Sequence, residues 1–240
     1  MAISMTATRV RASRDGMARD TLTKEQIVGA AIALLDEEGL DGLNMRSLGQ
    51  RLDSAATAMY WHVKNKDNLV RLAVDEVWGE IALPDPAATD WRAAAEAMAT
   101  GMYTVLARHP WLVQAQASHL LYGPNKSRHD ERALAIFEAA GFDDDDADRA
   151  VAAIFLFVLG NATGPAANVS LRRRLGKGGA DPETQLAQAM TEATAIAGKF
   201  PRLRARIERA AGTGYNAAPD STFRFGLAAL LDGLGARTAS

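Results

Sequence analysis

The chain has 240 residues, no cysteine and a formal net charge of −2, with 48% hydrophobic and 23% charged residues. Because it is not a polycation, any nucleic-acid binding must come from a local basic patch. The absence of cysteine excludes thiolate catalysis, disulfides and cysteine-based zinc sites, and it fits a reducing cytoplasm. The length suits one large domain, or a small domain joined to a larger one.

The first 21 residues are polar, aperiodic and contain four arginines. We expect residues 1–21 to form a flexible basic arm, either a solvated tail or a segment that reaches a DNA groove or phosphates. No apolar stretch long enough for a signal peptide follows. The longest apolar run, residues 147–167, carries charged residues and ends at Gly-Pro, which predicts a buried helix and no membrane span. We therefore expect a cytoplasmic protein with no membrane partner.

Capping residues mark the first helices. Thr23 and Gln26 are spaced as a capping box, and Gly39 is placed to end that helix in a left-handed conformation. Asn44 predicts the N-cap of a helix over residues 45–52. After a turn at Asp-Ser, a second short helix is expected over residues 55–61.

A long helix over residues 66–83 is predicted next, capped by Asn65 and closed by two prolines. The remaining chain also has helical periodicity, with further helices including residues 128–140 and 147–161. Residues 171–181 are basic and glycine-rich, and we expect a flexible loop there. No segment has the alternation of a strand, so the predicted fold class is all-α, with about nine or ten helices.

Residues 44–71 carry five basic and two acidic side chains, a local excess of positive charge in a slightly acidic protein. Two short helices around a tight turn have the form of a helix-turn-helix. Small residues at 55–58 would let the second helix approach DNA closely, and Thr57 could contact a base edge. Tyr60, Trp61 and His62 at its far end suit sugar and phosphate contacts. The alternative is a generic helical hairpin with both aromatics in the core.

The octet Met-Tyr-Trp-His-Val-Lys-Asn-Lys at residues 59–66 resembles the DNA-binding domain of TetR-family transcriptional regulators. This resemblance implies a helix-turn-helix domain over residues 22–66, followed by a ligand-binding and dimerisation domain over residues 67–240. It also implies a homodimer that reads a palindromic double-stranded DNA operator. The DNA-contacting residues expected on this basis are Arg46, Ala56, Thr57, Tyr60, Trp61, His62, Lys64 and Lys66. Ala56-Thr57 replaces the Gln-Pro pair that the tetracycline-repressor branch uses, so the operator sequence should differ.

The second domain should contain an apolar ligand cavity, because methionines and aromatic residues there adapt to irregular hydrophobic ligands. The expected wall residues are Met98, Met102, Trp111, His119, Tyr122 and Phe155. His119 matches, by resemblance, a histidine that coordinates magnesium–tetracycline, but the other residues of that site are absent, so we expect no metal and no cofactor. His119 could instead bind a ligand hydroxyl or carbonyl, or cap a helix. Plain core packing is the alternative for the methionines and aromatics.

The function predicted from these features is transcriptional repression, relieved by a small hydrophobic or aromatic molecule. An activator, or a regulator with no small ligand, fits the sequence as well. A third possibility, an enzyme, would use the four histidines His62, His109, His119 and His129, yet no HExxH motif, activated nucleophile pair or phosphate loop supports it. The apolar helices near residues 147–161 and 223–234 are expected to pair with their mates across the dimer interface.

Overall fold

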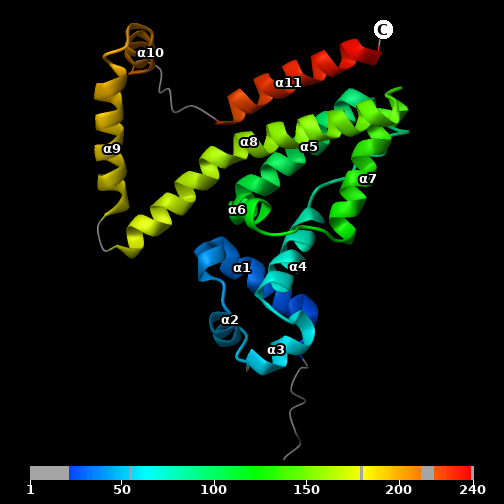
Figure 1. The fold of residues 1–240 in the computed structure, drawn as a ribbon, viewed down its shortest axis with the longest axis vertical. Helices are drawn as coiled ribbons and strands as arrows, with labels where there is room; N and C mark the ends of the chain where they lie inside the picture. Colours follow the sequence, from blue (N-terminus) through cyan, green and yellow to red (C-terminus); the bar gives the residue numbers. More distant parts are fainter. Residues whose placement is uncertain (1–21, 55, 179–180, 212–218, 239–240) are drawn as a thin grey trace, which may run out of the picture.

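The computed structural model describes residues 22–54, 56–178, 181–211 and 219–238, so the predicted arm at residues 1–21 lies outside it. These residues form eleven helices and no strand, which confirms the all-α class with slightly more helices than predicted. The helices are α1 Lys24–Gly42, α2 Met45–Arg51, α3 Ala56–Val63, α4 Lys66–Trp78, α5 Trp91–Arg108, α6 Trp111–Ser118, α7 Pro124–Ala139, α8 Asp144–Lys177, α9 Pro182–Ala197, α10 Pro201–Ala211 and α11 Pro219–Thr238. Figure 1 shows α1–α3 grouped at one end of the molecule and α5–α8 with α11 at the other.

The predicted caps of the first helices are present. Gln26 N donates to Thr23 Oγ1 at 3.2 Å and Thr23 N donates to Gln26 Oε1 at 2.8 Å, which completes the capping box. Asn44 and Asn65 accept from backbone N–H groups at the starts of α2 and α4, each at 2.8 Å. Gly39 has a φ of 74°, a left-handed value that favours glycine, although a last helical turn follows it.

Helix α4 connects the two ends of the molecule. It packs against α1 and α3 on one side and against α5 and α7 on the other (Figure 1). The helix ends at Trp78, five residues earlier than predicted, because the chain passes into tight turns after Gly79. Glu80 then meets the C-terminal end of α5, where its Oε2 lies 2.6 Å from Nη1 of Arg108.

Helix α8 is much longer than predicted. The expected helix over residues 147–161 continues through Pro165 to Lys177, so the prediction of a flexible loop from residue 171 was wrong over most of its length. A proline inside a helix removes one backbone hydrogen bond, but α8 packs against α5, α6, α7 and α11. Near its C-terminal end, Arg173 Nη2 donates to the carbonyl of Asp36 on α1 at 3.0 Å. These tertiary contacts stabilise the helix beyond the proline.

Helix α7 begins at Pro124 and not near residue 128 as predicted, because proline is well suited to the first position of a helix. Helix α11 packs closely on α8: a side chain at Gly226 would overlap the ring of Phe157. Phe223 of α11 also stacks on Tyr103 of α5, with ring centroids 4.2 Å apart. Helices α9 and α10 stand apart from this body as an arm (Figure 1), and α9 has no buried residue.

By length and composition alone, α8 is the one helix of the described residues that could cross a membrane. It packs against α5, α6, α7 and α11, and also against α9. Only 28% of its most apolar stretch is buried within the single chain, so a large apolar face remains uncovered.

Candidate DNA-binding and ligand sites

The helix-turn-helix unit, residues 44–66, presents two aromatic side chains outward. Met59 and Val63 are fully buried and fix α3 to α1 and α4. The intervening Trp61 is 90% exposed and Tyr60 is 48% exposed. The alternative in which both aromatics lie in the core is therefore wrong. Two large exposed rings on one short helix are available to a partner outside the chain.

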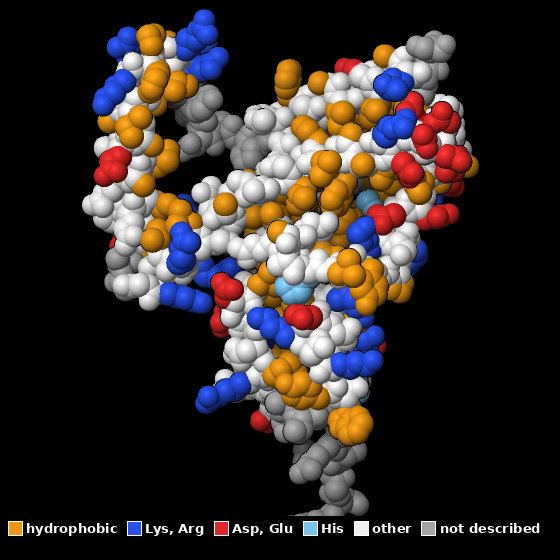
Figure 2. Space-filling model, in the orientation of Figure 1, with side chains coloured by type: hydrophobic (Ala, Val, Ile, Leu, Met, Phe, Trp, Pro, Cys, Tyr) orange, Lys and Arg blue, Asp and Glu red, His pale blue; other side chains and the backbone are white. Residues whose placement is uncertain are grey.

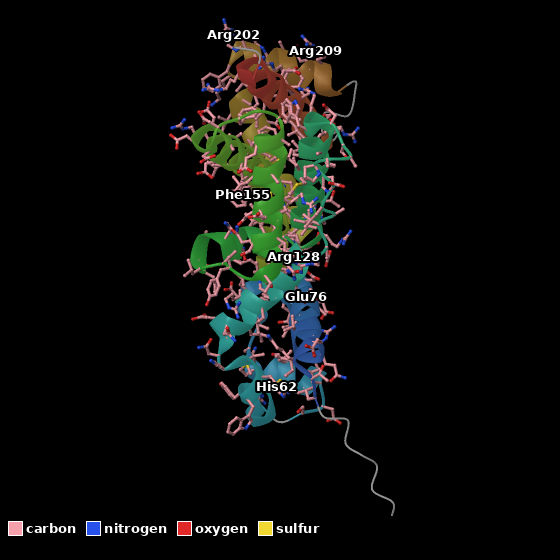
Figure 3. The ribbon with its side chains drawn as sticks, turned by 90° about the vertical axis from the view of Figure 1, so that its right-hand side faces the viewer. His62, Glu76, Arg128, Phe155, Arg202 and Arg209 are labelled. Carbon is pink, nitrogen blue, oxygen red and sulfur yellow. The ribbon has the colours of Figure 1, made fainter. Side chains whose placement is uncertain are left out.

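The basic residues of this unit are mostly free to meet phosphates. Arg46, His62 and Lys64 are exposed, and Figure 3 shows His62 at the far end of the molecule from the body of the second domain. Lys64 has a φ of 58°, which turns the chain between α3 and α4. Lys66 is also exposed, but its Nζ donates to the carbonyl of Leu40 at 2.9 Å.

Ala56 and Thr57 lie in the first turn of α3, and their side chains are outside the described residues. Arg51 is already paired: its guanidinium donates to both carboxylate oxygens of Glu37, at 2.6 and 2.7 Å. This hydrogen bonding holds the pKa of Glu37 below its usual value. Arg51 is not in the predicted DNA-contacting set, and its guanidinium fork is used within the protein.

A cavity of about 290 Å³ lies between α5, α7 and α8, and Gln116 of α6 also lines it. Met98, Met102 and Phe155 all line it, so three of the six expected wall residues come together. Figure 2 shows hydrophobic side chains gathered in the middle of this face, and Figure 3 places Phe155 in the body of the second domain. An apolar cavity with a few polar groups is the usual form of a small-molecule site. A larger hollow of about 510 Å³ between α1 and α8 includes charged side chains of both signs in its lining.

The polar end of the cavity comes from α7, which the sequence analysis did not select. Lys126, His129 and Asp130 line it, and Lys126 Nζ lies 2.6 Å from Asp130 Oδ2. Burial would raise the pKa of Asp130, but the neighbouring His129 imidazole and Lys126 ammonium outweigh this and lower it. His129 is only 7% exposed, and neither of its ring nitrogens has a hydrogen-bond partner. Its neighbours in sequence are polar, so periodicity gave no sign of burial.

The other three expected wall residues lie elsewhere. Trp111 is 2% exposed at the start of α6, where its Nε1 donates to Oδ1 of Asp36 on α1 at 2.7 Å. His119 lies in a surface depression after α6, with its Nε2 3.6 Å from Oδ1 of Asp67 on α4. Tyr122 borders the same depression, and its ring faces the guanidinium of Arg71 at 4.7 Å. All three therefore contact α1 or α4 across the junction between the two ends of the molecule.

A buried carboxylate, also missed from the sequence, joins α4 to α7. Oδ1 of Asp75 accepts from the backbone N–H groups of Asn125 and Lys126, both at 3.0 Å, and so caps the N-terminus of α7. The side chain of Asn125 donates back to the Asp75 carbonyl at 2.9 Å. Gly123 makes this approach possible, because a side chain there would overlap the Asp75 carboxylate. The cavity wall on α7 is thus fixed directly to α4.

The four histidines do not form a catalytic group. They lie on α3, at the end of α5, after α6 and on α7, and they contact different neighbours. Within the described ranges, no three histidine, aspartate or glutamate side chains gather into a set that could hold a metal ion.

Two family models match the chain. Residues 27–73 match "Bacterial regulatory proteins, tetR family", and residues 83–238 match "Tetracyclin repressor-like, C-terminal domain". An HTH-type transcriptional regulator of Saccharopolyspora erythraea is 37% identical over 64% of this chain and 65% of its own length. The HTH-type transcriptional repressor DrrR1 of Streptomyces coeruleorubidus is 33% identical over 90% of this chain and 78% of its own length.

Among solved structures, the TetR family protein ActR of Streptomyces coelicolor, in complex with actinorhodin, is similar with a TM-score of 0.70. The two sequences are 26% identical, and the matched region covers 90% of this chain and 96% of the ActR chain. Together with the exposed helix-turn-helix and the cavity in the second domain, these matches define the class of protein. Its members are regulators and not enzymes. The chain belongs to the TetR family of bacterial transcriptional regulators.

Proposed function

We propose that the protein is a cytoplasmic repressor that binds a palindromic operator as a homodimer and releases it when a small hydrophobic or aromatic molecule binds. The repressor DrrR1 and the actinorhodin complex of ActR support this direction, because one similar protein represses transcription and another binds a small molecule. The ligand sits in the cavity between α5, α7 and α8 in this proposal.

The DNA contacts are assigned to the exposed side of the helix-turn-helix unit. Tyr60, Trp61 and His62 contact sugar and phosphate, together with Lys64 and Lys66. Arg46 and the start of α3, at Ala56 and Thr57, face the bases. The exposure of Trp61 and the partial exposure of Tyr60 beside these cations support the assignment.

The observation that carries the ligand response is the bond between Asp75 and the start of α7. Lys126 is both a cavity residue and one of the two residues whose N–H groups Asp75 binds. A ligand that displaces α7 therefore moves α4. Helix α4 begins at Lys66, next to α3, which is the recognition helix of the helix-turn-helix unit. Figure 3 shows Glu76 of α4 between His62 below and Phe155 above, as a connecting lever requires. A small rotation of α4 would change the separation of two recognition helices in a dimer.

The dimer is assigned to α8 and α11. These helices pack side by side and leave large apolar residues uncovered, including Leu156 at 64% and Phe225 at 79% exposure. Two neighbouring apolar faces of this kind suit a four-helix interface with a second copy. Leu156→Lys should give monomers in sedimentation equilibrium, whereas Leu120→Lys, which changes an even more exposed leucine away from α8, should leave dimers. If Leu156→Lys still forms dimers, α8 is not part of the dimer interface.

The function is tested in two steps with the full chain. Selection from a random double-stranded DNA library should return a palindrome with half-sites about one helical turn apart. Compounds that raise the melting temperature are then titrated into the protein–operator complex, and fluorescence anisotropy should report release. Compounds that bind but tighten the complex would contradict repressor release and favour the activator alternative.

A further inference from the structure

The side chain of His129 is placed as the polar contact for a ligand. It is buried to more than nine-tenths, it lines the cavity, and both of its ring nitrogens lack a hydrogen-bond partner. Buried polar atoms without partners are rare because each has lost its hydrogen bonds to water without replacing them. The remainder of the cavity wall is largely apolar, with Met98, Met102 and Phe155 in it. A ligand group that hydrogen-bonds to the imidazole would supply the partner that the ring lacks.

The surroundings of His129 decide which kind of group fits. Nδ1 lies 3.6 Å from Oδ1 of Asp130, and a carboxylate on that side favours the proton on Nδ1. In the neutral ring, Nε2 is then an acceptor with no donor. The edge of the ring also meets Trp78, with centroids 4.8 Å apart, so an indole already covers one side. The terminal torsion of histidine is broad, and a modest turn of the ring can present Nε2 to the cavity.

The charges around the cavity argue against an anionic ligand. Lys126 is the cation among the polar lining residues, and it is already paired with Asp130 at 2.6 Å. Asp148 adds a second carboxylate to the wall. A carboxylate ligand would therefore enter a site whose positive charge is used and whose remaining formal charge is negative. A neutral hydrogen-bond donor on an aromatic body meets both the apolar wall and Nε2.

We infer that the cavity recognises a neutral phenol, whose aromatic rings lie against the methionines and Phe155 and whose hydroxyl donates to Nε2 of His129. This inference rests on the proposed function and narrows its ligand to hydroxylated aromatic compounds. The volume of about 290 Å³ is at the lower end for ligand pockets, which suits two fused rings better than four.

The test compares 2-naphthol with naphthalene, which has the same rings and no hydroxyl. Isothermal titration calorimetry with the full-length protein should show roughly three- to tenfold tighter binding of 2-naphthol, the usual effect of one buried hydrogen bond. In His129→Phe the ring is retained without nitrogen atoms, and the preference should disappear. His119→Gln is the matched control, and it should keep the preference because His119 lies in the separate depression beside α4.

A second variant covers the case in which His129→Phe does not fold, as judged by circular dichroism. His129→Gln keeps an acceptor at this position and should retain part of the preference for 2-naphthol. Equal binding of the two compounds by the wild type, or a preference that persists in His129→Phe, overturns the phenol assignment and leaves the cavity assignment standing. Failure of both compounds to bind the wild type instead contradicts the ligand cavity of the proposed function, and the phenol assignment falls with it.

Discussion

The helix-turn-helix unit has a tryptophan near the end of the short helix α3, and the second domain has one at the start of the short helix α6. One of these side chains is exposed to solvent and the other is buried. Trp61 on α3 is 90% exposed, while Trp111 on α6 is 2% exposed and donates to Asp36. The first is available only to a partner, and the second holds α6 against α1. The same residue type therefore serves binding in one region and internal structure in the other.

This contrast extends to the two regions as wholes. The candidate DNA-contacting residues fall within one short stretch, from Arg46 to Lys66, and those whose side chains the structure describes are exposed. The cavity gathers residues from Ala95 to Phe155, on α5, α6, α7 and α8, and His129 is a buried polar group in its wall. A binding surface can be encoded by a short motif, whereas a cavity exists only after distant segments have packed.

The largest effect is expected for Trp111→Ala. Loss of a buried tryptophan leaves a cavity and removes the hydrogen bond from Nε1 to Asp36, so the free energy of unfolding should fall by about 3–5 kcal/mol in urea titrations. Because Trp111 does not line the ligand cavity, the ratio of 2-naphthol to naphthalene affinity should be unchanged in the folded fraction. A selective loss of ligand binding without loss of stability would place Trp111 in the ligand site.

Asp75→Ala should come next, with a loss of about 2–3 kcal/mol in unfolding free energy, because two backbone N–H groups of α7 lose a charged acceptor. Asp75→Asn keeps one side-chain oxygen and should lose less stability. If Asp75 couples α7 to α4, Asp75→Asn should still bind operator but need more ligand for release in anisotropy titrations. Unchanged ligand release in this variant would mean that coupling runs through other contacts.

Lys66→Ala tests the phosphate assignment at the start of α4. Operator affinity should fall by about 1 kcal/mol, and the slope of log affinity against log salt should become shallower by about one unit. Lys199→Ala removes the same charge from the exposed turn between α9 and α10, and it should change neither quantity. An equal effect of the two substitutions would show that only net charge matters.

The smallest effect on stability is expected for Trp61→Ala. A side chain that is 90% exposed contributes little to folding, so the unfolding free energy should change by less than about 0.5 kcal/mol. Operator binding at fixed salt should nevertheless weaken clearly in a mobility shift. If Trp61→Ala strongly lowers the unfolding free energy but leaves DNA binding intact, Trp61 has a structural role like that of Trp111 and is not a DNA contact.

Local chemistry explains what could be predicted. The caps at Thr23, Asn44 and Asn65 use side chains that bond to backbone groups two or three residues away, so the sequence contains both partners. Apolar spacing likewise predicted most of the helices. Met98, Met102 and Phe155 were found as cavity residues because adaptable apolar side chains suit such walls.

The errors at α8 and His119 involve contacts between distant segments. Pro165 and the glycines after it indicated the end of a helix, yet packing on four helices and the contact of Arg173 with Asp36 extend α8 to Lys177. His119 was preferred over His129 on the basis of resemblance, although His119 faces Asp67 and His129 lines the cavity. Neither orientation can be deduced from neighbours along the chain.

By itself, the sequence determined the all-helical class, the positions of the caps and the residues of the helix-turn-helix unit, because each depends on interactions within one or two helical turns. Only the tertiary structure decided that Asp75 caps α7, that Trp111 holds α6 to α1, and that His129 is buried without a partner. Each of these three features forms only when helices that are tens of residues apart in the sequence pack together. The free energy of each depends on burial in that packing, which no local sequence pattern specifies.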